Sequence, residues 1–162
     1  MKKSKSNNIN LDMFEKSPDL AEVNISYKIK LKNILRITNS KEAFDALYPL
    51  FDKDIIGFKE EFYMILLNRA KYVLGWFKIS SGGTTGTVVD PKIIFIVALK
   101  TNADSILLGH NHPSGNVKPS DADIKMTTRI HEAGKLFEIS LLDHLIVTPD
   151  GSFYSFADEG VV

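Results

Sequence analysis

The sequence contains no cysteine, and this absence excludes several kinds of site. Disulfides, thiol nucleophiles and zinc sites built on thiolates all need cysteine. A zinc nucleobase deaminase is disfavoured for the same reason, because its PCxxC ligands cannot exist here. The absence fits a reducing compartment, and we expect the protein to be cytoplasmic.

Net charge and long apolar runs are also missing. Lys and Arg together number 20, and so do Asp and Glu, which makes the formal net charge zero. A protein that binds bare phosphate backbone usually carries a basic excess, so this balance gives no support to direct DNA binding and leaves it undecided. No segment reaches the ~18 consecutive apolar residues of a membrane span. The polar start, MKKSKSNNIN, also lacks the apolar core of a secretory signal.

The length and composition are those of one globular domain. The chain has 162 residues, of which 44% are hydrophobic and 25% charged. Residues 1–21 are polar and without periodicity, which predicts a flexible N-terminal arm. We expect residues 22–162 to fold as a single domain.

Predicted strands and helices alternate along the chain. Period-2 patterns and short apolar runs predict strands over residues 23–31, 60–80 (two strands around a turn near 68–71), 104–110, 137–148 and 152–158. Helical spacing and cap signals predict helices near 40–51, 90–103 and 120–134, with Ser40, Asp90 and Ser120 at their starts and Gly134 ending the last. This order predicts an α/β fold with a mixed β-sheet packed between α-helices. The glycine-rich stretch 80–87 matches neither phosphate-binding fingerprint, so we interpret it as a plain loop.

The stretch GHNHPSGNVKPSDAD, residues 109–123, concentrates side chains that carry chemistry. Two of the four histidines, His110 and His112, lie two residues apart in it. In extended backbone, side chains at i and i+2 share a face, so both imidazoles can point at one centre. Asp123 falls in the first turn of the next predicted helix. Two imidazoles and one carboxylate make the ligand set of a catalytic zinc centre, which leaves a position open for water.

A simpler interpretation covers part of this pattern. Ser120 to Asp123 has the form of a capping box, which explains the serine and the aspartate without any chemistry. Capping and metal binding are compatible, because the cap holds the helix end while Asp123 faces the metal.

The full pattern, His-x-His, seven residues, Ser, two residues, Asp, resembles the JAMM motif of MPN (JAB1-type) metallopeptidases. HNHPSGNVKPSDAD resembles the RadC-like family in particular, and the similarity runs from about Val23 to the C-terminus through EEFYMILLN, GGT, LLDHLIV and YSFADEG. The resemblance implies a single MPN/JAB-type domain with cytidine-deaminase-like layering. Many RadC-like proteins carry an N-terminal helix-hairpin-helix segment, for which we expect too little chain before Val23.

The resemblance also implies the parts of a catalytic site. These are Zn²⁺ held by His110, His112 and Asp123, an upstream glutamate as general base on a metal-bound water, and Ser120 as a donor to the tetrahedral intermediate. Zinc lowers the pKa of its water to about 7, so a nearby carboxylate can take the proton and deliver it to a leaving amine.

The base is either Glu60 or Glu61, which face opposite ways in a strand. Both faces of the following residues are equally apolar, so alternation does not decide. The family pattern places the base two residues before a phenylalanine, Phe62 here, which selects Glu60.

The function predicted from the resemblance is a zinc-dependent metallohydrolase that cuts peptide or isopeptide bonds, with a homodimer as one possible assembly. The alternative is a nucleic-acid-associated accessory protein linked to DNA repair or recombination. A non-catalytic scaffold is disfavoured, because such scaffolds usually lose ligands and this chain keeps the whole set.

Five further residues are interpreted from the sequence. The pair Asp143-His144 is either a structural hydrogen bond, which we favour, or an outer partner of a metal ligand. His131, in the middle of a helix, is predicted to lie on the surface. Trp76 and Phe77 are predicted to belong to the core or to a partner surface.

Overall fold

The computed structural model describes residues 26–27, 35–82 and 89–162. The predicted arm over 1–21 and nearly all of the strand predicted over 23–31 lie outside the described residues, as does most of the glycine-rich stretch 80–87. Among the described helices, none combines the length and apolar character that a membrane span requires.

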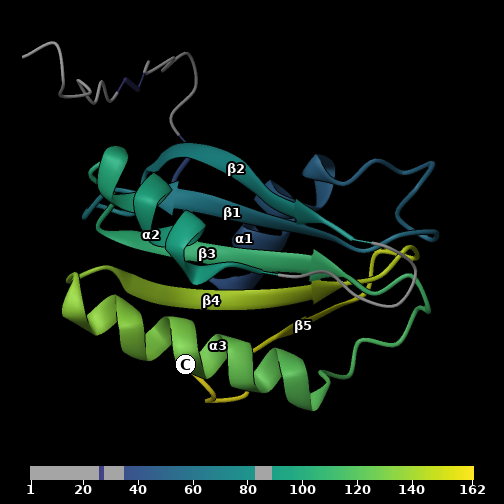
Figure 1. The fold of residues 1–162 in the computed structure, drawn as a ribbon. Coiled ribbons are helices and arrows are strands. Elements are labelled where there is room, and N and C mark those ends of the chain that lie inside the picture. The colour runs from purple at the N-terminus through teal and green to yellow at the C-terminus, as the bar shows by residue number, and fades with distance from the viewer. Residues whose placement is uncertain (1–25, 28–34, 83–88) are drawn as a thin grey trace, which may run out of the picture.

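Five strands form one mixed sheet in the order β2-β1-β3-β4-β5 (Figure 1). They are β1 (Glu61–Leu67), β2 (Val73–Ser81), β3 (Ser105–Asn111), β4 (Ser140–Val147) and β5 (Phe153–Ser155). The central pair β3 and β4 is parallel, and the other pairs are antiparallel. The mixed α/β sheet predicted from the sequence is therefore confirmed.

Helices cover both faces of this sheet (Figure 1). They are α1 (Ser40–Leu47) with the 3₁₀ helix η2 (Tyr48–Leu50), α2 (Pro91–Lys100) and α3 (Asp121–Leu136). Met64 of β1 packs in a core cluster with α2 and α3, whereas its neighbour Ile65 packs in a second cluster with α1. Because both faces of β1 are covered, its two sets of alternating side chains are equally apolar.

The start of α1 differs from the prediction. The N-cap is Asn39 rather than Ser40, because the Asn39 side chain accepts a hydrogen bond from the backbone N–H of Glu42 at 2.9 Å. Asp90 caps α2 as predicted and accepts from the backbone N–H of Lys92 at 2.9 Å. That helix ends at Lys100, three residues earlier than predicted.

Gly134 does not end α3, as the sequence suggested, but lies inside it. A Cβ at this position would stand 2.3 Å from the carbonyl oxygen of Ile139, so glycine permits the chain to return close to the helix. The turn back is made by Glu138, whose φ of 55° is left-handed. Phe137 consequently caps the helix, and β4 begins at Ser140 rather than at 137.

Two aromatic residues of β2 face solvent. Trp76 is 57% exposed and Phe77 40% exposed on this edge strand of the sheet. The interpretation that Trp76 and Phe77 belong to the core is therefore wrong. That they form a partner surface stays a prediction. The predicted last strand is also shorter than expected, since β5 covers only Phe153–Ser155.

The close approach at Gly134 predicts the effect of adding a methyl group there. Alanine favours a helix by about 1 kcal/mol over glycine, but its Cβ would collide with backbone that cannot rotate away. We expect Gly134→Ala to lower the free energy of unfolding by about 1–3 kcal/mol in urea titrations. Gly57→Ala is the control, because its Cβ would meet only ordinary contacts at 3.6 Å. Equal stability of the two variants would contradict the packing described.

Candidate metal centre

Three segments bring the predicted site residues to one end of the sheet. His110 lies in β3, and His112 follows that strand, with its backbone N–H donating to the carbonyl of Val147 at 2.9 Å. Because β1 runs antiparallel to β3 and pairs Phe62 with His110, Glu60 arrives just before β1 beside the same imidazole. Asp123 comes from the first turn of α3.

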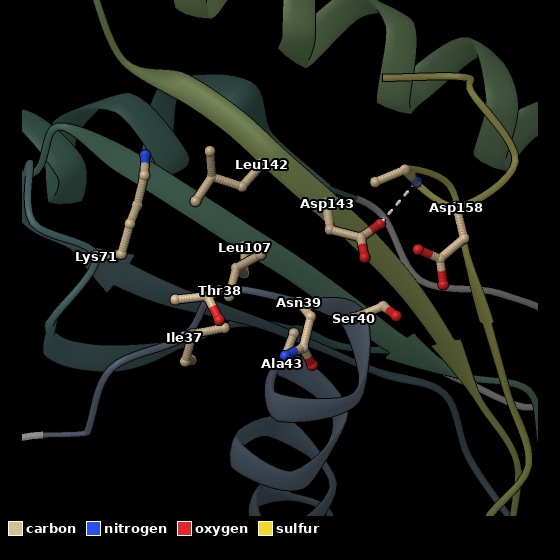
Figure 2. A pocket seen from close by; sticks show the side chains of 11 residues that line it. Ile37, Thr38, Asn39, Ser40, Ala43, Lys71, Leu107, Leu142, Asp143 and Asp158 are labelled. Carbon is tan, nitrogen blue, oxygen red and sulfur yellow. Dashed lines mark hydrogen bonds between the residues drawn. The ribbon is translucent and has the colours of Figure 1, made fainter.

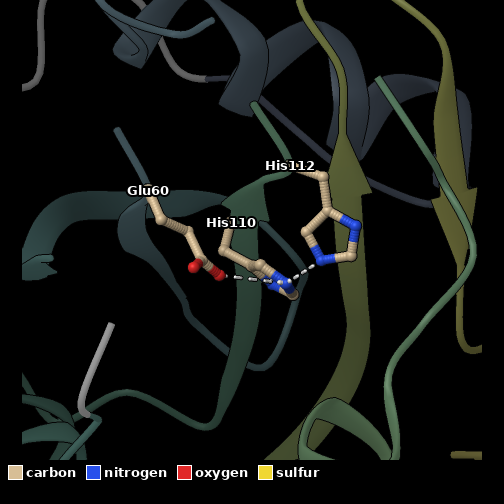
Figure 3. A group of neighbouring side chains, drawn as sticks. All are labelled: Glu60, His110 and His112. Carbon is tan, nitrogen blue, oxygen red and sulfur yellow. Dashed lines mark hydrogen bonds and ion pairs between the residues drawn. The ribbon is translucent and has the colours of Figure 1, made fainter. Parts of the chain in front are cut away.

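The side chains of Glu60, His110 and His112 converge (Figure 3), and Asp123 joins them. The Nε2 atoms of His110 and His112 are 3.0 Å apart. Asp123 places Oδ1 at 3.2 Å from His110 Nε2 and Oδ2 at 3.6 Å from His112 Nε2. The Oε1 atom of Glu60 is 3.8 Å from His110 Nε2. Glu60 and the two histidines alone offer three ligand atoms within 4.8 Å of one another, so a possible metal-binding triad is present.

The hydrogen bond of His112 to the backbone fixes which of its nitrogens carries the proton. Its Nδ1 lies 2.6 Å from the carbonyl oxygen of Asn116. A carbonyl only accepts, so Nδ1 must donate. In the neutral imidazole the lone pair is then on Nε2, which faces the cluster.

A longer chain of hydrogen bonds fixes His110 in the same way. The Thr127 hydroxyl donates to the carbonyl of Asp123 at 2.6 Å, so it must accept from Nδ1 of His144, 2.7 Å away. Complete burial lowers the pKa of His144 well below its ordinary value, so this neutral ring has one proton. Its Nε2 therefore accepts from Nδ1 of His110 at 2.9 Å. A neutral His110 is left with its lone pair on Nε2, also facing the cluster.

The donor set fits a metal ion. Two lone pairs that face each other at 3.0 Å repel unless a proton or a metal ion lies between them. Ligand atoms around a tetrahedral zinc, at about 2.0–2.1 Å from the ion, lie roughly 3.3 Å from one another. The 3.0 Å between the Nε2 atoms of His110 and His112, and the 3.2 Å between His110 Nε2 and Asp123 Oδ1, are close to that value.

The electrostatics of the cluster favour positive charge at its centre. Burial alone would raise the pKa of Asp123, but Nε2–H bonds from His110 and His112, which form when a second proton charges those rings, and the hydrogen bond from Ser120 hold it far below its usual range. The hydrogen bond to Asp123 raises the pKa of His112, although burial opposes this. Burial raises the pKa of Glu60 above its ordinary value, against the opposing effect of the two histidines.

Ser120 is the N-cap of α3, and its hydroxyl is engaged with Asp123. The capping box forms completely: Ser120 Oγ and its backbone N–H donate to Asp123 Oδ2 at 2.5 and 2.8 Å, and the Asp123 N–H approaches Ser120 Oγ at 3.2 Å. The predicted cap is therefore confirmed. In this arrangement Ser120 orients the Asp123 carboxylate, and its hydroxyl would have to rotate to meet a substrate oxygen.

Glu60 and Glu61 have different surroundings. The Glu61 carboxylate is buried away from the histidines, where it forms an ion pair with Lys78 at 2.7 Å and accepts from the Tyr63 hydroxyl at 3.1 Å. The side chain of Glu60 is 17% exposed and reaches His110. The structure thus brings Glu60, and not Glu61, to the cluster.

The pair Asp143-His144 makes the structural hydrogen bond that we favoured from the sequence, since the backbone N–H of His144 donates to Asp143 Oδ1 at 2.7 Å, and His144 has a second role besides. His144 touches His110, which corresponds to the outer-partner interpretation. Asp143, however, does not orient the His144 ring, because its carboxylate accepts from the backbone N–H groups of His144 and Ala157 and from the Ser155 hydroxyl. The family-like DH pair was the only sequence signal for His144.

Thr127 and His131 also differ from what sequence patterns indicate. Thr127, fully buried in α3, had no signal of its own in the sequence. His131 is half-buried rather than on the surface, and its Nδ1 has no hydrogen-bond partner among the described residues.

A cavity of about 470 Å³ lies on the α1 side of the sheet (Figure 2). Ala43 of α1 and Asp143 of β4 line it, whereas no residue of the metal cluster does. Since side chains alternate along β4, Asp143 faces this cavity and His144 faces the cluster. The cavity is therefore separate from the candidate site.

The hydrogen-bond chain through Thr127 predicts a specific effect on metal binding. Thr127→Val keeps the shape but removes the acceptor for Nδ1 of His144, so the tautomer of His144, and through it that of His110, is no longer fixed. We expect zinc affinity, measured by chelator competition, to fall about 10–100-fold. Thr128→Val is the matched control, because its hydroxyl makes the same kind of bond, to the carbonyl of Ile124 at 2.9 Å, on the exposed side of α3. Equal zinc affinities for the two variants would refute the role of the chain.

Comparisons with known proteins identify the family of this chain. Residues 37–161 match the RadC-like JAB domain. A UPF0758 protein of Flavobacterium johnsoniae is 42% identical over 135 residues, which are 82% of this chain and 55% of the relative. One of Porphyromonas gingivalis is 37% identical over 146 residues, or 88% of this chain and 63% of the relative. The chain thus spans less than two thirds of the length of these relatives, whose names state no activity. It belongs to the RadC-like JAB domain family.

Proposed function

We propose that the protein is a zinc-dependent hydrolase that cleaves amide bonds in peptides or isopeptides. The observation that carries this proposal is the convergence of two imidazole lone pairs and a carboxylate, with Glu60 beside them. A JAB-type domain is compatible with such an activity.

His110, His112 and Asp123 would hold the metal. Their spacing supports this set over one with Glu60 as third ligand, because Asp123 lies closer to His110, at 3.2 Å against 3.8 Å. The set holds two imidazoles, one carboxylate and no thiolate, which zinc accepts with an open fourth position. When bound, zinc lowers the pKa of a water molecule and polarises a carbonyl.

Glu60 is proposed as the general base. Its carboxylate is half-buried beside the cluster, and burial raises its pKa, which improves its match to neutral pH. It accepts the proton of the attacking water and then delivers that proton to the nitrogen of the leaving amine.

Ser120 is proposed to act in two ways. Its hydroxyl orients the Asp123 carboxylate in the resting arrangement. On rotation it can donate to the negative charge that develops on the carbonyl oxygen. The backbone N–H of Ser120 also donates to Asp123 Oδ2, at 2.8 Å.

The alternative function, a nucleic-acid-associated accessory protein, remains a separate proposal. Retention on DNA that weakens steeply as salt rises would support it.

The proposal predicts that Glu60 affects turnover rather than metal binding. Glu60→Gln keeps the shape but cannot accept a proton, so we expect near-normal zinc content and hydrolysis reduced roughly 10²–10⁴-fold. Glu61→Gln is the comparison variant; its thermal melt would show the cost of losing the ion pair with Lys78 while zinc-dependent cleavage persists. Unchanged cleavage by Glu60→Gln, together with its loss in a folded Glu61→Gln protein, would assign the base to Glu61 instead.

A further inference from the structure

A groove of about 340 Å³ adjoins the metal cluster between the N-terminal ends of α2 and α3. Val89 and Pro91 line it from the start of α2. Asp123 lines the groove and also belongs to the metal cluster, so the two are neighbours. The α3 wall is a single stripe of side chains at i, i+3, i+4 and i+7: Ala122, Lys125, Met126 and Arg129. We call this the α2–α3 groove.

The two cations of the groove have no anionic partner among the described residues. Lys125 and Arg129 are exposed, and neither forms an ion pair there. Glu132, three residues after Arg129, instead pairs with Lys135 at 2.7 Å. The groove, which Asp123 also lines, thus presents two positive charges that form no ion pair within the described part of the chain.

The spacing of these cations is unfavourable to the helix itself. Lys125 and Arg129 are four residues apart, so their like charges lie on neighbouring turns and destabilise α3. The N-terminal ends of α2 and α3 add positive electrostatic potential at the end of the groove where both helices begin. An anion in the groove would relieve this repulsion, and the apolar walls formed by Val89 and Met126 suit the methylene stem of an acidic side chain.

The distance between Asp123 and Arg129 along α3 limits where such an anion lies relative to the metal cluster. Arg129 is six residues beyond Asp123 on α3, or about 9 Å along the helix axis. An extended peptide advances about 3.3 Å per residue, so this distance corresponds to two or three residues. A guanidinium can also hold a carboxylate through two parallel hydrogen bonds, which gives direction to the contact.

We propose that the α2–α3 groove binds an acidic side chain of a peptide substrate, within about three residues of the cleaved bond. This inference rests on the proposed function. A peptide carboxylate is favoured over a nucleic acid, because phosphate backbone is bound through a series of cations and a basic excess, whereas this groove offers two cations on a chain of zero net charge. Lys125 and Arg129 are the specificity-determining residues.

The test compares two peptides that differ only in one charge, N-acetyl-Ala-Ala-Glu-Ala-Ala-amide and its Gln counterpart. Binding to the zinc-loaded Glu60→Gln chain is followed by NMR titration of the α3 amides. We expect the Glu peptide to bind about 5- to 10-fold more tightly. In the Lys125→Gln/Arg129→Gln background that advantage should fall to within about twofold. Lys135→Gln, on the same helix but outside the groove, is the control and should preserve the preference.

Different outcomes separate this inference from the proposed function. Equal binding of the two peptides, or a Glu preference that survives the double substitution, overturns the inference. A short DNA duplex that shifts the same amides more strongly than the Glu peptide, and is released by salt, also overturns it in favour of phosphate. A preserved Glu preference, together with failure of the zinc-loaded parent chain to cleave any peptide of a random library, supports the groove and contradicts the hydrolase.

Discussion

Two imidazole nitrogens, Nε2 of His110 and Nε2 of His112, lie 3.0 Å apart while both Nδ1 atoms donate to other partners. This proton arrangement leaves two lone pairs facing each other, which is unfavourable without a cation between them. The suitability of the cluster for a cation therefore depends on the hydrogen-bond partners of the two Nδ1 atoms, His144 and Asn116, as much as on the imidazole rings themselves. Asp123 adds a carboxylate as the third candidate ligand, with Oδ1 at 3.2 Å from His110 Nε2.

The sheet provides the geometry that this arrangement needs. Parallel pairing of β3 with β4 sets Leu108 opposite His144, which brings the His144 ring beside that of His110. Antiparallel pairing of β3 with β1 brings Glu60 to the same end. The capping box of α3 then fixes Asp123, so one local motif both begins a helix and aims a carboxylate.

Local patterns predicted much of the candidate site, and contacts distant in sequence account for the rest. The spacing of His110 and His112 and the capping box around Ser120 are short-range features, so the sequence reveals them directly. The contact between His110 and His144 joins residues 34 positions apart, and only the strand pairing creates it. Gly134 was misjudged for the same reason, since its close neighbour, the carbonyl of Ile139, lies across a tight turn beyond the end of α3.

The most direct test of the account is the zinc content of chain purified without chelator, combined with anomalous diffraction at the zinc edge. The account predicts near-stoichiometric zinc and one anomalous peak close to the Nε2 atoms of His110 and His112. Both should vanish in a folded His110→Ala/His112→Ala protein. Parent chain without bound metal, or a double variant that keeps its zinc, would contradict the central claim.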